Sequence, residues 1–284
     1  MAEPGAGLAI LAGAGTLPRR IAEDRAARGL PYLVVSFGPG AVWMHAHPHQ
    51  CHRFEKPGRL FAALRRAGCG SVVFAGGMDR PRLNPLAFDL KGLTVAPRVL
   101  ALMARGDDGL LSGLARIFEA EGFRLLAAQD CLPGLTEGPG VPTRARPSAA
   151  DRSDAARAGA ILAALGPLDV AQAAVVARGV CLGIEAVEGT DALLARIAAL
   201  PEGKRAHCPP PSGVLVKRPK PGQDRRADWP TIGPDTVAGA AAAGLSGIAV
   251  EAWGALILER AETLAAADRA GLFLWSAPAE DLAP

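Results

Sequence analysis

The sequence predicts an α/β protein of two domains, with a parallel β-sheet in the first and a mixed α/β arrangement in the second. At 284 residues, the chain exceeds the length at which a single hydrophobic core is usual. Short apolar runs alternate with amphipathic segments of helical length, an alternation that is typical of α/β folds. A segment rich in proline and glycine, residues 133–148, interrupts this alternation and predicts a linker between the domains.

The first domain, residues 1–132, is expected to hold strands that alternate with helices. The strands are predicted at residues 8–12, 32–37 and 71–75, and the helices at 17–28, 59–67, 97–103 and 110–121. Strands separated by helices of this length pair in parallel, because the helix returns the chain to the same end of the sheet. The pattern therefore predicts a doubly wound parallel sheet.

The second domain, residues 133–284, is expected to continue after the linker with an alanine-rich helix. Helices are predicted at residues 149–165, 191–199, 235–243 and from near 262, and strands at 173–177, 180–186, 213–217, near 248 and 256, and at 272–275. The first two of these strands are consecutive and are joined at Arg178-Gly179. This half of the chain therefore predicts a mixed α/β domain.

Composition and charge exclude several classes of protein. The net charge is +3, from 31 basic and 28 acidic residues, which is too even for a nucleic-acid-binding face. The five cysteines have no pair at the close spacing of a redox or zinc motif, and a reducing cytoplasm accounts for them. The N-terminus lacks the basic and apolar regions of a signal peptide, and the uncharged residues 236–250 are too few to span a bilayer. We therefore expect a cytoplasmic protein with no nucleic acid as a partner.

A glycine-rich turn (GAGTLP) follows the first predicted strand and opens the first helix. Glycine lets the backbone approach a ligand, and a helix N-terminus offers free N–H groups to a phosphate. This Rossmann-like arrangement predicts anion contacts from Gly13 and Ala14, whereas Pro18 stands where a dinucleotide fingerprint has its third glycine. Gly76 and Gly77 repeat the arrangement after the third strand, so both turns are expected at one rim of the sheet. A tight turn without a ligand is the alternative at each site.

Two groups of polar residues could bind a cation or a sugar phosphate. Asp107 and Asp108 precede a predicted helix and could hold a hard cation such as magnesium, although helix capping is the simpler explanation. Gln172, Thr190 and Asp191 lie at strand ends and at the start of a helix, where they could contact a sugar phosphate. Capping of that helix would equally explain Thr190 and Asp191.

The densest polar segment, residues 217–233, combines five basic residues with two carboxylates, Asp224 and Asp228. Hydrolysis of a pyrophosphate requires charge compensation and a group that binds metal or orients water. An aspartate among cations stays ionised, because nearby positive charge favours its charged form. On composition alone, an active site and a solvated basic loop are equal alternatives here.

Four of the five histidines fall within residues 45–52, together with Cys51. Imidazole and thiolate groups are zinc ligands. Pro48 interrupts their alternating spacing, so no strand is predicted that could fix four ligands around an ion. Adventitious metal binding is therefore the preferred interpretation of this histidine cluster.

Six motifs, in order along nearly the whole chain, resemble the LpxI family of UDP-diacylglucosamine pyrophosphatases. They are AGAGTLP at 12–18, FAGG at 74–77, RGDD at 105–108, EAVEGTD at 185–191, KPGQDRR at 220–226 and DWPTIG at 228–233. The resemblance implies a two-domain, magnesium-dependent hydrolase that binds its lipid between the domains. It also implies the conversion of UDP-2,3-diacylglucosamine to 2,3-diacylglucosamine 1-phosphate and UMP, in lipid A biosynthesis. The family's essential acid matches Asp228, which favours an active site over a solvated loop.

The resemblance and the residue chemistry together assign roles to the candidate residues. Asp228 is expected to bind magnesium or to orient the attacking water, and the further candidates are also carboxylates, Asp224, Asp107 and Asp108. The expected phosphate contacts are cations of the basic segment, Lys220, Arg225 and Arg226. The remaining expected substrate contacts are Gly13, Ala14, Gly76, Gly77, Gln172, Thr190 and Asp191.

Two other classes of protein stay open. The glycine turn suggests a nucleotide-dependent oxidoreductase, which Pro18 disfavours, as does the absence of an acid after the second strand at Ser36-Phe37-Gly38. A non-catalytic lipid or nucleotide carrier fits the fold but gives no purpose to the acid in the basic segment. The acyl chains of the implied substrate predict transient, peripheral contact with the inner-membrane face, and a homo-oligomer stays open.

Overall fold

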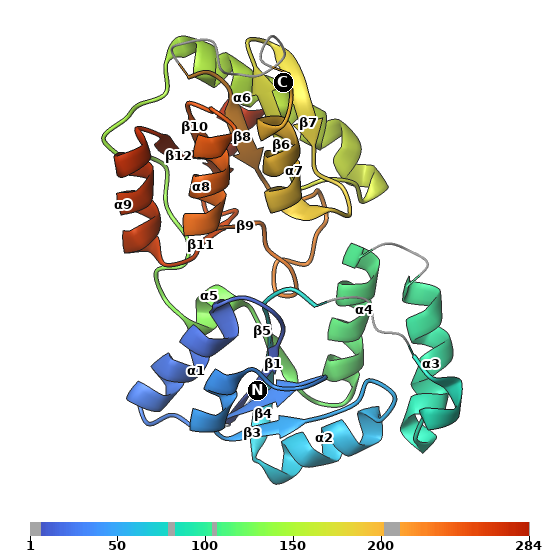
Figure 1. The fold of residues 1–284 in the computed structure, drawn as a ribbon. Coiled ribbons are helices and arrows are strands. Elements are labelled where there is room, and N and C mark those ends of the chain that lie inside the picture. Colours follow the sequence, from blue (N-terminus) through green and yellow to red (C-terminus); the bar gives the residue numbers. More distant parts are fainter. Residues whose placement is uncertain (1–6, 79–82, 104–106, 202–210, 284) are drawn as a thin grey trace. The chain divides into compact units, whose positions relative to one another are not determined.

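The computed structural model describes residues 7–78, 83–103, 107–201 and 211–283, and the chain divides into two compact units (Figure 1). Unit 1 comprises Met1–Pro133 and the short segment Asp224–Asp228, and unit 2 comprises Gly134–Gln223 and Trp229–Pro284. The chain therefore passes between the units three times. Unit 1 receives a segment from the second half of the chain, which the sequence pattern does not predict.

Unit 1 is built on a five-stranded sheet of order β3-β2-β1-β4-β5, in which every neighbouring pair is parallel. The strands are β1 (Gly7–Ala12), β2 (Tyr32–Ser36), β3 (His49–Cys51), β4 (Cys69–Ala75) and β5 (Arg124–Leu126). This confirms the predicted parallel sheet. The strand order reverses between β1 and β4, and open α/β sheets bind ligands beyond the carboxyl ends of the strands at such a point.

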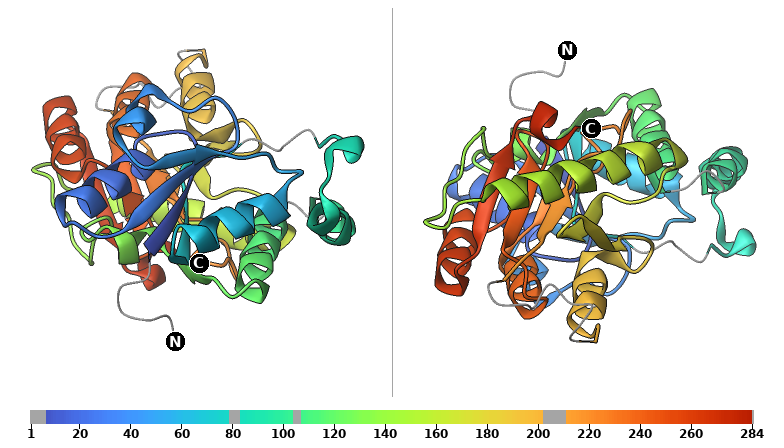
Figure 2. Two further views of the ribbon diagram at one scale, coloured as in Figure 1. Left: turned by 90° about the horizontal axis from the view of Figure 1, so that it is seen from below. Right: turned by 90° about the horizontal axis from the view of Figure 1, so that it is seen from above.

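Helices lie on both faces of the unit 1 sheet (Figure 2). The helices of the unit are α1 (Leu17–Ala27), α2 (Pro57–Arg66), α3 (Leu90–Met103), α4 (Asp107–Ala120) and α5 (Ala128–Cys131), with 3-10 turns η1 (Val42–Ala46) and η2 (Pro85–Ala87), and α3 packs on α2 and α4. Ala9 and Leu11 of β1 face a core that includes Phe61 of α2 and Phe118 of α4. Alternate residues of a strand point to opposite faces, so Leu8 faces the other way, where α1 packs on β1 and β2.

Several elements of unit 1 differ from the sequence prediction, which includes neither α5 nor the 3-10 turns η1 and η2. The strands β3 and β5 are not predicted, because each has only three residues, and the side chains of β3 are exposed and polar. The helix α3 begins at Leu90, seven residues before the predicted start at Pro97. Proline favours the first turn of a helix, but Pro97 lies inside α3 and removes one of its backbone hydrogen bonds.

Unit 2 is built on a mixed sheet of order β12-β10-β8-β6-β7, beside a two-stranded ladder of β9 and β11. The strands are β6 (Ala173–Ala177), β7 (Val180–Ile184), β8 (Val214–Lys217), β9 (Thr231–Ile232), β10 (Gly247–Glu251), β11 (Leu256–Ile257) and β12 (Phe273–Ala277). The strands β8, β10 and β12 are parallel, and β6 runs antiparallel to β7 and β8. The carboxylate of Asp154 closes the β6–β7 hairpin by accepting the N–H groups of Arg178 (2.8 Å) and Gly179 (2.7 Å).

The helices of unit 2 also divide between the two faces of its sheet (Figure 2). They are α6 (Ala149–Leu165), α7 (Gly189–Ala198), α8 (Pro234–Ala242) and α9 (Arg260–Ala270), with 3-10 turns η3 (Gly166–Leu168) and η5 (Ala279–Leu282). Helix α6 packs Ala158 and Leu162 against one face, and α7, α8 and α9 cover the other. This arrangement confirms the predicted mixed α/β class of the second half.

The proline- and glycine-rich segment that predicts a linker is packed against unit 2 over residues 134–148. The Leu135 carbonyl accepts the Ile257 N–H (2.6 Å), and the Thr143 hydroxyl accepts the Leu274 N–H (2.9 Å). Leu135 and Thr143 are buried. The segment is therefore an ordered part of unit 2, whose backbone groups are paired by tertiary contacts that composition does not reveal.

Candidate active site

Two glycine turns meet at the carboxyl edge of the unit 1 sheet. The Gly13 N–H donates to the Ala75 carbonyl (2.8 Å), and the Ala14 N–H donates to the Gly77 carbonyl (2.7 Å). A Cβ atom on Gly13 would lie 2.3 Å from the Gly77 oxygen, and one on Gly76 would lie 2.1 Å from the Ala14 oxygen. The close approach of the two turns therefore requires glycine, and the turns share one rim of the sheet as expected.

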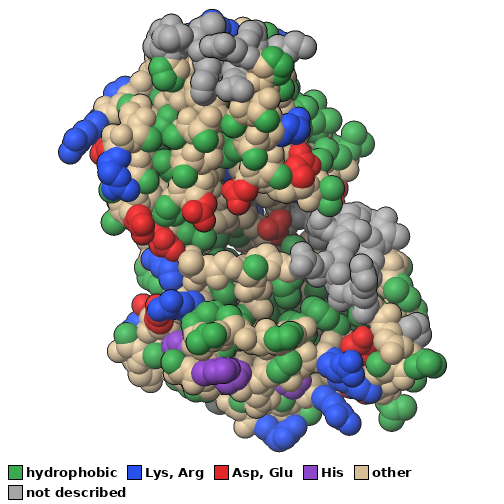
Figure 3. Space-filling view, viewed as in Figure 1, with side chains coloured by type: hydrophobic (Ala, Val, Ile, Leu, Met, Phe, Trp, Pro, Cys, Tyr) green, Lys and Arg blue, Asp and Glu red, His purple; other side chains and the backbone are tan. Residues whose placement is uncertain are grey.

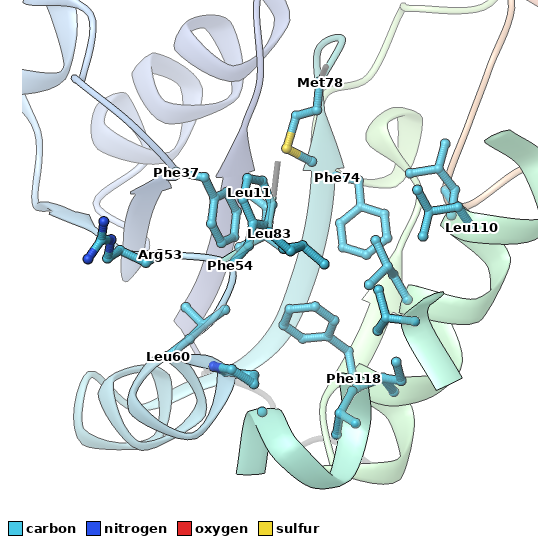
Figure 4. A pocket seen from close by; sticks show the side chains of 18 of the residues that line it. Leu11, Phe37, Arg53, Phe54, Leu60, Phe74, Met78, Leu83, Leu110 and Phe118 are labelled. Atoms are coloured by element: carbon cyan, nitrogen blue, oxygen red, sulfur yellow. The ribbon is translucent and has the colours of Figure 1, made fainter. Parts of the chain in front are cut away.

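An apolar cavity of about 340 Å³ lies in unit 1 beside the second glycine turn (Figure 4). Its wall is mostly apolar and includes six aromatic rings, those of Phe37, Phe54, Phe61, Phe74, Phe88 and Phe118. Gly76 and Gly77 complete the wall on the side of the glycine turns. Among the described residues of the wall, Arg53 and Asp228 are the charged ones. Such a cavity suits a hydrocarbon chain attached to a polar group.

Asp228 reaches this cavity because the segment Asp224–Asp228 belongs to unit 1. Ala227 packs against the core of unit 1, next to Asp228. The Asp228 N–H donates to the Asp224 carbonyl (3.2 Å), so the segment forms a tight turn. The structure thus brings together Asp228, Gly76 and Gly77, which the sequence analysis selects from distant motifs.

Arg226 is bound by two carboxylates of unit 1. Its guanidinium donates to both Asp224 oxygens, from Nε (3.0 Å) and Nη2 (2.8 Å), and to Glu119 from Nη1 (2.6 Å). These hydrogen bonds from Arg226 hold the pKa of Asp224 below its ordinary value, and the same carboxylates raise the pKa of Arg226. Glu119 does not appear in the sequence analysis, because its helical position gives no sign of this contact.

Other cations of the basic segment are also paired within the protein. The Lys220 ammonium group is largely buried in an ion pair with Asp169, and Arg218 pairs with Glu251 (3.2 Å). Arg225 is exposed. Direct contact of Lys220, Arg225 and Arg226 with phosphate stays a prediction, and Lys220 and Arg226 already bind the carboxylates of Asp169, Asp224 and Glu119.

In unit 2, a hydrogen-bonded group lies at the edge where β8 and β7 end. The buried Lys217 ammonium donates to the Thr190 hydroxyl (2.7 Å) and to the Thr231 carbonyl (2.9 Å). Thr190 in turn donates to Glu185 (2.5 Å), which also accepts the Gln172 N–H (3.3 Å). The structure therefore joins the predicted residues Gln172 and Thr190 through Glu185, and Lys217 bonds to the same Thr190 hydroxyl. The signal for Lys217 in the sequence is a charge that ends an otherwise apolar strand.

Several predicted residues lie outside these groups. Asp191 is exposed in the first turn of α7. Asp107 and Asp108 begin α4, but their side chains lie outside the described part of the chain. The predicted metal contacts of Asp107 and Asp108 therefore stay predictions.

The histidine cluster lies at the surface of unit 1 (Figure 3). His49 belongs to the edge strand β3, which the sequence analysis does not predict, and the Tyr32 hydroxyl bonds to His47 Nδ1 (2.6 Å). Within residues 7–78, 83–103, 107–201 and 211–283, no three or more histidine, cysteine, aspartate or glutamate residues are grouped to hold a metal ion. Cys51 is a free thiol.

Comparison with known proteins relates this geometry to a family. The family models for the LpxI N-terminal domain and the LpxI C-terminal domain match residues 7–135 and 138–275. The UDP-2,3-diacylglucosamine pyrophosphatase LpxI of Caulobacter vibrioides is 38% identical over 270 residues, which are 94% of this chain and 96% of that protein. These matches confirm the resemblance that the six motifs indicate. The chain therefore belongs to the LpxI family.

Proposed function

We propose that the protein hydrolyses the pyrophosphate of UDP-2,3-diacylglucosamine to 2,3-diacylglucosamine 1-phosphate and UMP, a step of lipid A biosynthesis. Water forms one new P–O bond, the bridging P–O bond breaks, and the bridging oxygen stays with the other phosphate. One observation carries the proposal: in a chain of the LpxI family, Asp228 supplies the carboxylate on the wall of an apolar cavity. A lipid-linked pyrophosphate needs both an apolar and a charged binding surface.

The acyl chains are the part of this substrate that the cavity suits. The aromatic wall offers apolar contact, while Gly76, Gly77 and Asp228 form its polar side. The turn from Gly13 leads directly into α1, whose N-terminal N–H groups favour an anion. The proposal therefore places an acyl chain in the cavity and a phosphate near the glycine turns.

Magnesium is the proposed cofactor, and the residues present fit this ion. Magnesium is commonly bound by one or two carboxylates together with substrate phosphates, so a single protein carboxylate suffices when a pyrophosphate is bound. Asp228 would hold the ion, while Asp224 already accepts two hydrogen bonds from the Arg226 guanidinium. Bound magnesium would offset phosphate charge. The Asp228 carboxylate would in addition accept a hydrogen bond from the attacking water and so orient it.

Release of UMP by purified protein tests this function. With magnesium, UDP-2,3-diacylglucosamine should be hydrolysed, and a chelator should stop the release. UDP-glucosamine without acyl chains should be hydrolysed at least about tenfold less efficiently, since it lacks the apolar contacts that the cavity provides. Failure of the folded protein to release UMP would overturn the proposed function and favour a lipid carrier. Equal hydrolysis of both substrates would instead contradict the proposed placement of an acyl chain in the cavity.

The proposed function includes contact of unit 1 with a membrane surface. Large apolar side chains are exposed on η2 and α3, namely Leu86, Leu90, Leu93 and Leu100. Leu90, Leu93 and Leu100 recur at helical spacing on α3, opposite the positions that line the cavity, Val95 and Val99. Residues 90–103 include Lys91 and Arg98 and no acidic residue. No helix of the described ranges has the length and apolar character needed to cross a bilayer, so the proposed contact is peripheral.

Replacing Leu90 and Leu93 by serine should weaken binding to vesicles of mixed neutral and anionic lipid by roughly tenfold, because two apolar side chains no longer enter the lipid. Cosedimentation with the vesicles measures this. Val187→Ser is the matched control, because Val187 is a fully exposed apolar residue of unit 2. If both variants bind as the unaltered protein does, α3 is not the contact surface.

A further inference from the structure

Glu119, Arg226 and Asp224 form a continuous chain of charge-assisted hydrogen bonds within unit 1, here called the clamp. We propose that the clamp positions the Asp228 carboxylate at the cavity and that turnover depends on it. Arg226 is then a positioning residue, in place of the substrate contact that the sequence analysis expects. The inference rests on the proposed function, because it assigns the purpose of the clamp through Asp228.

The contacts fix the turn that ends in Asp228. Nε and Nη2 of Arg226 meet the two oxygens of Asp224, a bidentate geometry that restricts both side chains. The Arg226 N–H also donates to Asp224 Oδ1 (3.0 Å). The Asp224 carbonyl accepts the N–H groups of Ala227 (2.9 Å) and Asp228 (3.2 Å). The side chain and the backbone of Asp224 therefore hold the turn from both sides.

Glu119 connects this turn to the wall of the cavity. It lies in α4 next to Phe118, which lines the cavity, and it accepts a hydrogen bond from Arg226 Nη1 (2.6 Å). Ala227 packs on the same core as Phe118. The position of Asp228 is thus set relative to the wall against which the acyl chain is proposed to lie.

The charges of the clamp argue against a direct phosphate contact by Arg226. Two carboxylates already oppose one guanidinium, so a pyrophosphate would have to compete with Asp224 and Glu119 for it. Glu119 itself would repel a phosphate. A positioning role explains both acids, because each restricts the conformations of the Arg226 side chain and therefore those of the turn.

Glu119→Gln and Arg226→Lys should each lower kcat by about 10- to 100-fold and change KM by less than about threefold, because a misplaced catalytic group slows chemistry more than binding. Both variants should fold, since partly exposed ion pairs contribute little to stability. The double variant should be little slower than either single one, because both changes break the same chain of bonds. Glu121→Gln is the matched control: Glu121 follows α4 and pairs with Arg65 (2.7 Å), outside the clamp.

The substitution of Glu119 distinguishes the two possible roles of Arg226, positioning of Asp228 and direct binding of the substrate. Full activity of Glu119→Gln together with a raised KM of Arg226→Lys would overturn the proposal, because Arg226 would then bind the substrate directly.

Deuterium uptake by the peptide spanning residues 224–228 gives a readout that does not need activity. Faster uptake in Glu119→Gln than in Glu121→Gln supports the clamp, and equal uptake contradicts it. If the unaltered protein releases no UMP, the proposed function fails while the exchange experiment still decides whether the clamp holds the turn.

Discussion

Asp228→Ala should lower kcat for UMP release by at least about a thousandfold, as expected for loss of a group that binds metal or orients the attacking water. Asp228 provides the carboxylate among the described residues of the cavity wall, so no neighbouring acid of that wall replaces it. Its side chain is half-exposed and lies at the end of a turn, so removing it leaves the core intact. The variant should therefore retain the circular dichroism spectrum and the lipid binding of the unaltered protein.

Asp281→Asn provides the comparison for this loss of charge, because Asp281 is an exposed acid of η5 in unit 2. It should hydrolyse the substrate at the unaltered rate. Near-normal turnover by folded Asp228→Ala would show that the reaction does not require the Asp228 carboxylate. The acid would then have to be sought elsewhere in the basic segment or at Asp107 and Asp108.

Gly76→Ala should lower the free energy of unfolding of unit 1 by about 3 kcal/mol, the upper end of what a strained backbone position costs. Gly76 has a φ of +84°, and a Cβ atom there would lie 2.1 Å from the Ala14 oxygen. The substitution therefore forces the two glycine turns apart, because neither the backbone of Ala14 nor that of Gly76 can give way alone. Urea unfolding followed by circular dichroism measures the change.

Two neighbouring glycines separate backbone strain from the clash. Gly77→Ala should be nearly neutral, since its Cβ would meet nothing within 4 Å and its φ is not in the left-handed region. Gly15→Ala should cost about 1 kcal/mol, because its φ of +89° is left-handed but the surrounding space is open. If Gly76→Ala unfolds at the same urea concentration as Gly15→Ala, the close contact between the two glycine turns adds nothing to the cost of the Gly76 substitution.

The elements with long apolar patterns could be predicted from the sequence. Strand β6 and helix α6 have the bounds that the pattern predicts, because a buried strand and a capped alanine-rich helix both carry local signals. The strands β3 and β5 could not be predicted, since their stability comes from pairing with the neighbouring strands β2 and β4. The segment 134–148 reads as a linker for a related reason: its hydrogen bonds are with distant strands.

Part of the candidate site was also accessible to sequence reasoning. Glycine turns that follow parallel strands lie at one edge of the sheet, which predicts a shared rim for Gly13 and Gly76. Their direct contact depends on the pairing of β1 with β4, which the sequence does not predict. The partners of the cations were not accessible. Arg226 and Glu119 are 107 residues apart, and Lys220 and Asp169 are 51 apart. A basic segment therefore looks free to bind phosphate in the sequence, although the fold pairs much of its charge.

The discontinuity of unit 1 has a consequence for how the protein is made. The ribosome synthesises residues 1–133 first, and these contain all five strands of the unit 1 sheet. The cavity wall nevertheless lacks Ala227 and Asp228 until the first segment of unit 2, Gly134–Gln223, and then the segment Asp224–Asp228 have been synthesised. Domains that are contiguous in sequence can finish folding while synthesis continues. Here the N-terminal unit is completed only by a segment that is synthesised late, so a chain that is interrupted before residue 228 lacks the carboxylate that Asp228 supplies to the cavity wall.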